Sequence, residues 1–150
     1  MSGFLLDTNI PSELTRPVPD VRVSGWVDAQ DNASLYLSVV TVGELRRGFT
    51  LLPQSKRRTQ LEQWFEQYLL PLFVGRILPV TQRVGNRRGV LDGECQLRGT
   101  PLGTADGMIA ATALEHDLTV DAEREGLCRS WRHGFQPLGR RLNPSASPRN

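Results

Sequence analysis

Short apolar runs alternate along the chain with stretches of helical periodicity. Runs rich in apolar and β-branched residues, each short enough to be a buried strand, stand at 4–6, 35–40, 76–80 and 118–120. Apolar residues recur every three or four positions at 10–14, 21–30, 41–49, 55–73, 82–97 and 104–115, which predicts helices. Strands that alternate with helices predict an α/β domain whose mainly parallel sheet is flanked by helices.

Composition bounds the class of protein. The 150 residues are 39% hydrophobic, which is enough for one domain with a core. The formal charge is only +2, so any binding to nucleic acid must come from local basic patches. Cys95 and Cys128 match neither a disulfide framework nor a zinc site, and no apolar run is long enough for a signal peptide or a membrane span. We therefore expect a cytoplasmic protein that does not bind membranes.

Three carboxylates, Asp7, Glu44 and Asp106, stand where a helix is expected to begin after a strand or turn. Capping explains each one taken singly, because acids are favoured at helix starts. Asp7 could cap the first helix, and Asp106 lies in a first turn behind Thr104. Glu44 could close a capping box with Thr41.

The same three acids taken together favour a metal site. A parallel sheet places the carboxyl ends of its strands, and the helix starts that follow them, along one edge. Crowded carboxylates repel unless a cation neutralises them, and oxygen ligands suit a hard ion such as Mg²⁺ or Mn²⁺. Mg²⁺ keeps bound water and contacts phosphate oxygens, so such a site is suited to phosphodiester cleavage by metal-activated water.

Three ordered motifs carry a family resemblance. The segments 4–14 (FLLDTNIPSEL), 38–48 (SVVTVGELRRG) and 103–114 (GTADGMIAATAL) resemble those of PIN-domain ribonuclease toxins of the VapC type, from the VapBC toxin-antitoxin family. The resemblance covers roughly residues 3 to 120. It implies a PIN fold, Mg²⁺-dependent endoribonuclease activity, frequent homodimerisation and neutralisation by a VapB-type antitoxin. It also implies that Asp7, Glu44 and Asp106 are the catalytic metal ligands, with Thr8, Asn9 and Thr104 as supporting residues.

The chain departs from the family pattern after Val120. Family members continue with a segment like Thr-Arg-Asn-Val-Lys-Asp-Phe, which contributes a fourth acidic or amide group, whereas this chain continues with DAEREGLC from Asp121. One choice of codons for this region, read one base later after Val120, encodes the family-like ending. We therefore predict a frameshift, with a PIN core at 1–120 and an atypical, partly disordered segment at 121–150. Sequencing the gene tests this prediction.

Alternative functions remain open at this point. The leading hypothesis is an endoribonuclease of a type II toxin-antitoxin system. The rival is a catalytically impaired PIN remnant that only binds an antitoxin or itself. A phosphohydrolase built around Asp7 is disfavoured because no second aspartate follows two residues later. Basic residues at 46–47 and 56–58 are candidate contacts to RNA phosphates, although such runs are usually solvated helix faces.

Overall fold

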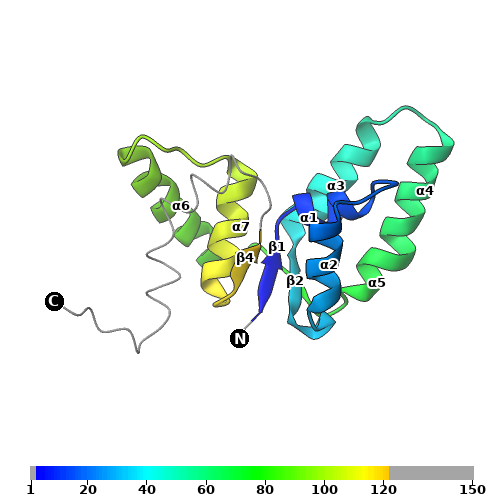
Figure 1. Cartoon of the computed structure of the whole chain (residues 1–150). Coiled ribbons are helices and arrows are strands. Elements are labelled where there is room, and N and C mark those ends of the chain that lie inside the picture. Colours follow the sequence, from blue (N-terminus) through cyan, green and yellow to red (C-terminus); the bar gives the residue numbers. More distant parts are fainter. Residues whose placement is uncertain (1–2, 122–150) are drawn as a thin grey trace.

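The computed structural model describes residues 3–121 and shows one parallel sheet with helices on both of its faces (Figure 1). The sheet order is β3-β2-β1-β4, and every neighbouring pair is parallel. The strands are β1 (Phe4–Leu6), β2 (Leu35–Ser38), β3 (Ile77–Leu78) and β4 (Thr119–Asp121). This architecture confirms the α/β fold class. No described helix is long and apolar enough to cross a membrane.

The helices follow the predicted order. They are α1 (Asn9–Leu14), α2 (Val21–Ala29), η1 (Asn32–Ser34), α3 (Val39–Leu51), α4 (Lys56–Trp64), η2 (Phe65–Leu69), α5 (Leu70–Leu72), α6 (Gln82–Leu97) and α7 (Thr104–Glu115). The bounds of α6 and α7 agree with the periodicity of the sequence. The predicted helix at 55–73 is a continuous helical run of α4, η2 and α5, in which η2 is a single π-helical turn.

Strand β1 lies at the centre of the sheet because it pairs on both sides. Phe4 is in register with Leu35 of β2 and with Thr119 of β4. Leu5 and Leu6 point to opposite faces, as expected for a strand. Leu5 packs with Ile109 of α7, whereas Leu6 joins the core formed with α1 to α5. A continuous apolar strand is therefore required at this position, since both of its faces are buried.

The boundary between β2 and α3 differs from the prediction. We expected a strand at 35–40 and a helix from Thr41, but β2 ends at Ser38 and α3 begins at Val39. The cause is the Ser38 hydroxyl, which accepts a hydrogen bond from the Val40 N–H at 3.0 Å and so caps the helix. Thr41 therefore lies inside α3, and the predicted capping box with Glu44 was wrong.

Helix α7 is buried on more of its surface than the periodicity predicts. We expected a buried side made of Ala105, Met108, Ile109 and Ala113. In the structure the whole stretch 109–113 and Gly107 are buried, whereas Ala105 and Met108 are only partly so. The reason is that α7 packs against the sheet, α3 and α6 at once, which small residues permit.

The replacement Gly3→Ala should destabilise the fold, because a Cβ at Gly3 would lie 2.5 Å from the Ser34 carbonyl oxygen. Strands β1 and β2 begin at this point and cannot separate without losing their pairing. We expect a loss of about 1–3 kcal/mol in the free energy of unfolding, measured by urea denaturation. Gly89→Ala in α6 is the matched control: no atom lies within 4 Å of its Cβ position, so it should be neutral or stabilising. Equal stability of Gly3→Ala and the wild type would contradict the close approach of the strands.

Candidate active site

Asp7 lies directly after the central strand and is nearly buried, with 5% of its surface exposed. One carboxylate oxygen, Oδ1, accepts a hydrogen bond from the Thr8 N–H at 2.7 Å. The other, Oδ2, accepts one from the Asn9 side-chain amide at 2.8 Å. The N-cap position of α1 is Thr8, which makes no side-chain capping bond, so the helix cap expected of Asp7 does not form as predicted. Thr8 and Asn9 instead orient the carboxylate.

Glu44 lies in α3 beyond its first turn, and its carboxylate therefore has no capping role. Thr41, one turn earlier in α3, is fully buried, and its hydroxyl oxygen lies 3.4 Å from that of Thr8. This contact is long for a hydroxyl hydrogen bond, yet it places the start of α3 beside the residue that follows Asp7. The removal of the capping alternative leaves the partly buried Glu44 available for another role.

Asp106 occupies the first turn of α7, where the helix dipole favours an acid. Its Oδ2 lies 3.5 Å from the position that a Cβ on Gly103 would take, so the carboxylate folds back toward the helix start. Gly103 is the N-cap residue and offers no side-chain cap. Thr104, the first residue of the helix, is exposed. The dipole explanation of Asp106 therefore stands beside the metal explanation.

The elements that carry the three acids meet at one edge of the sheet. Asp7 follows β1, and Glu44 lies on the helix that follows the adjacent parallel strand β2. The helix of Asp106 packs against α3. Within residues 3–121, however, no three acidic, histidine or cysteine side chains are close enough to hold a metal ion together. The all-oxygen donor set suits Mg²⁺, and bound waters would have to complete its coordination.

Comparison with known proteins decides the family. The family described as "PIN domain" matches residues 4–122. The chain belongs to the PIN domain family.

Relatives of known name place this PIN domain among the VapC/FitB-type toxins. Toxin FitB of Neisseria gonorrhoeae is 43% identical over 123 residues, which are 82% of this chain and 88% of FitB. VapC ribonuclease Y4jK of Sinorhizobium fredii is 42% identical over 117 residues, which are 78% and 84% of the two chains. These matches confirm the resemblance on which the sequence analysis relied.

Solved structures agree with the fold. A crystal structure of FitAcB from Neisseria gonorrhoeae superposes with a TM-score of 0.79 at 42% identity, over 85% of this chain and 91% of the other. FitAB bound to an IR36 DNA fragment gives a TM-score of 0.79 at 40% identity, over 85% and 89% of the two chains. VapBC2 from Rickettsia felis, at 22% identity and a TM-score of 0.64, supports the fold alone; the alignment covers 86% of this chain and 92% of the other.

The basic clusters of this PIN domain are mostly engaged within the chain. Arg58 donates to Glu62 at 2.9 Å and to the carbonyl oxygens of Thr50 and Leu52. Arg57 donates to the Thr15 carbonyl. Arg46 pairs with Glu66 and lies over the ring of Phe65, with its guanidinium carbon 4.9 Å from the ring centre. These arginines link α4 to α1 and α3, and α3 to η2, so a role for them in RNA binding stays only a prediction.

An apolar groove of about 650 Å³ lies on the side of the sheet that carries α2 and η2. Its wall includes Trp64, Tyr68 and Leu72 from the helical run and Leu14 and Val27 from α1 and α2. Tyr68 is 58% exposed. The π-helical turn carries Tyr68 while Phe65 and Leu69 stay buried. Tyr68 therefore presents an exposed aromatic ring at the groove.

Cys95 and His116 take no visible part in the site. Cys95 is buried, and this burial raises the pKa of its thiol, which disfavours a nucleophilic thiolate. His116 is the C-cap residue of α7, the place expected from the sequence. Cys128 and the acids at 123 and 125 lie outside the described residues.

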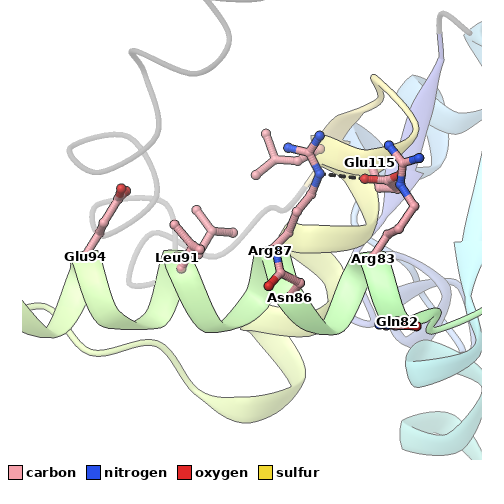
Figure 2. A pocket seen from close by; sticks show the side chains of 9 residues that line it. Gln82, Arg83, Asn86, Arg87, Leu91, Glu94 and Glu115 are labelled. Carbon is pink, nitrogen blue, oxygen red and sulfur yellow. Dashed lines mark hydrogen bonds and ion pairs between the residues drawn. The ribbon is translucent and has the colours of Figure 1, made fainter.

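An ion-pair cluster at the far end of α7 was missed by the sequence analysis. Arg83 and Arg87 of α6 both reach Glu115, with Nε-to-oxygen distances of 2.5 and 2.6 Å (Figure 2). They border a cavity of about 750 Å³ between α6 and α7. The hydrogen bond from Arg87, together with the charge of Arg83, lowers the pKa of Glu115. The spacing of four residues between the arginines was the available signal.

The replacement Glu115→Gln should lower thermal stability in a pH-dependent way. Because the folded pKa is lowered, the ionised carboxylate stabilises the fold above its unfolded value of about 4.5, and this stabilisation is lost as pH falls through the folded pKa. We expect the difference in thermal unfolding midpoint between the wild type and the variant to be constant from pH 6 to about pH 7. This difference should shrink below about pH 4.5. Asp117→Asn, at an exposed position after α7, serves as the control. A difference that is independent of pH would contradict the ion-pair account.

Proposed function

We propose that this PIN domain is a metal-dependent endoribonuclease toxin of a type II toxin-antitoxin system. The observation that carries the proposal is the placement of Asp7, Glu44 and Asp106 on three elements that meet at one sheet edge. The names of its relatives, Toxin FitB and VapC ribonuclease Y4jK, support the same reading. A cytoplasmic location, where RNA is the substrate, belongs to this proposal.

The three acids would hold the ion in distinct ways. The Asp7 carboxylate is already oriented by the hydrogen bonds that it accepts from Thr8 and Asn9. It would therefore lose little conformational freedom when an ion binds. Glu44 and Asp106 would complete the protein ligands from α3 and α7. A bound Mg²⁺, or Mn²⁺, would supply a water acidified enough to attack an RNA phosphodiester without a covalent enzyme intermediate. Thr104, exposed at the start of α7, stays a candidate supporting residue.

The replacements Asp7→Asn, Glu44→Gln and Asp106→Asn should each reduce Mg²⁺-dependent cleavage of single-stranded RNA by at least about a hundredfold, as expected for loss of a group that stabilises charge at the reacting centre. Each amide is nearly isosteric with the acid it replaces, so the thermal midpoint should change little in Glu44→Gln and Asp106→Asn. Asp7→Asn should lower it, because one of the two hydrogen bonds that the carboxylate accepts is lost. The matched control is Asp117→Asn, which changes an exposed aspartate at the opposite end of α7. Full cleavage by Asp7→Asn, or equal loss in Asp117→Asn, would refute the assignment.

A catalytically impaired remnant that only binds an antitoxin or itself is the second candidate. The observation in its favour is that no set of three potential metal ligands closes within the described part of the chain. The frameshift predicted near Val120 also favours an impaired enzyme, because it would remove the fourth acidic position. Residues 122–150 lie outside the described structure. Cleavage of RNA by the purified wild-type chain in Mg²⁺, abolished by EDTA, would exclude this candidate.

The partners follow from the same proposal. The solved relative FitAB, at 40% identity, supports pairing of this chain with a VapB-type antitoxin. A homodimer is part of the proposal because the family resemblance implies it. The exposed Tyr68 in the apolar groove supports a protein partner on that side of the sheet. Expression of the toxin should arrest growth, and co-expression of a small protein encoded by the adjacent gene should restore it. Arrest by the wild type but not by Asp7→Asn separates toxicity by cleavage from toxicity by binding.

A further inference from the structure

Arg88 occupies a position in α6 that the helical pattern reserves for apolar residues. Val84, Leu91 and Cys95 are buried on one stripe of this helix, and Arg88 lies four residues after Val84 and three before Leu91. The stripe faces α7, where Val84 and Leu91 pack with Ala110 and Ala111. The seam between the two helices therefore contains a charged side chain.

Arg88 packs against the first turns of α7. A Cβ placed on Gly107 would lie 3.4 Å from the Arg88 Nε and 3.5 Å from its Cγ. Gly107 is buried, and these distances are ordinary van der Waals contact, so the stem and Nε of Arg88 lie directly against this turn. The residue before Gly107 is Asp106, and Arg88 thus packs on the same turn that carries this acid.

The charge of Arg88 is poorly compensated within residues 3–121. Its side chain is 24% exposed, and its one ion pair, to Asp92 on the same helix, is 3.8 Å long. Its Nε is buried and has no hydrogen-bond acceptor. Arg83 and Arg87 of the same helix, in contrast, both hold Glu115 at short distance (Figure 2). A half-buried cation at a helix N-terminus is unfavourable, both through desolvation and through the helix dipole.

We propose that Arg88 binds a phosphate group of the RNA beside the acidic edge, an inference that rests on the proposed nuclease function. Three carboxylates and one divalent ion leave a net negative charge, which repels a polyanion unless a further cation is near. A guanidinium presents paired N–H donors that match phosphate oxygens. The exposed part of Arg88 would make this contact, while its stem stays packed on Gly107.

The test compares Arg88→Met, which keeps the length of the stem, with Arg88→Lys, which keeps the charge. Arg83→Met is the matched control, because Arg83 lies on the same helix but pairs at the other end of α7. Binding of labelled single-stranded RNA is measured by fluorescence anisotropy in EDTA over a range of KCl concentrations. Cleavage is measured separately in Mg²⁺, and circular dichroism verifies the fold.

Arg88→Met should weaken RNA binding by about tenfold or more, the effect of one lost charged hydrogen bond. The slope of log K against log salt should fall in magnitude by about 0.7, the value for one lost phosphate contact in a single strand. Arg88→Lys should keep the slope, and Arg83→Met should keep both quantities. If Arg88→Met fails to fold, Arg88→Gln takes its place in the comparison with Arg88→Lys.

The proposal is overturned if Arg88→Met binds RNA with the affinity and the salt slope of the wild type. It is also overturned if Arg83→Met loses as much RNA affinity as Arg88→Met. If the wild type cleaves RNA and Arg88→Met binds it unchanged, this inference fails while the proposed function stands. If the wild type binds RNA through Arg88 but does not cleave it, the nuclease proposal fails alone. No RNA binding by the wild type in EDTA would overturn the proposal for Arg88, and no cleavage of RNA in Mg²⁺ would contradict the proposed function.

Discussion

Strand β1 pairs in parallel with β2 on one side and with β4 on the other, and the position of every candidate site residue depends on this double pairing. The pairing places the residue after Leu6 at the carboxyl edge of the sheet, next to the start of α3. A shift of the pairing by one residue would turn Leu5 and Leu6 each to the opposite face of the sheet. Each side chain would then leave the apolar core in which it is now buried. Asp7 is therefore held at the edge by the burial of its apolar neighbours.

Periodicity and motifs predicted much of the fold, and local chemistry explains where they failed. Helix α6 was placed correctly despite three interior glycines, because Val84, Leu91 and Cys95 still recur at helical spacing although Arg88 interrupts their stripe. The end of β2 was misplaced because Val39 and Val40 favour strands, whereas the Ser38 hydroxyl caps a helix at that point. The burial of α7 was underestimated because its small residues carry no amphipathic signal but allow close packing on several sides.

The assignment of the site residues stays a prediction, and the structure adds contacts that the sequence could not reveal. The motif pattern named Asp7, Glu44 and Asp106, and the parallel sheet gave a reason to expect their elements at one edge. The bonds that orient Asp7 and the approach of Thr8 to Thr41 depend on the folded backbone, so no spacing in the sequence reveals them. The structure also removed the capping explanation of Glu44, which strengthens the metal interpretation for that residue.

The central claim is that these three acids bind one divalent ion. Anomalous diffraction from crystals of the full chain soaked in Mn²⁺ tests it most directly, because manganese scatters anomalously and replaces magnesium at oxygen sites. The account predicts one peak within about 2.5 Å of carboxylate oxygens of Asp7, Glu44 and Asp106, absent from crystals of Asp7→Asn. A peak elsewhere alone, or no peak at this edge, would contradict it.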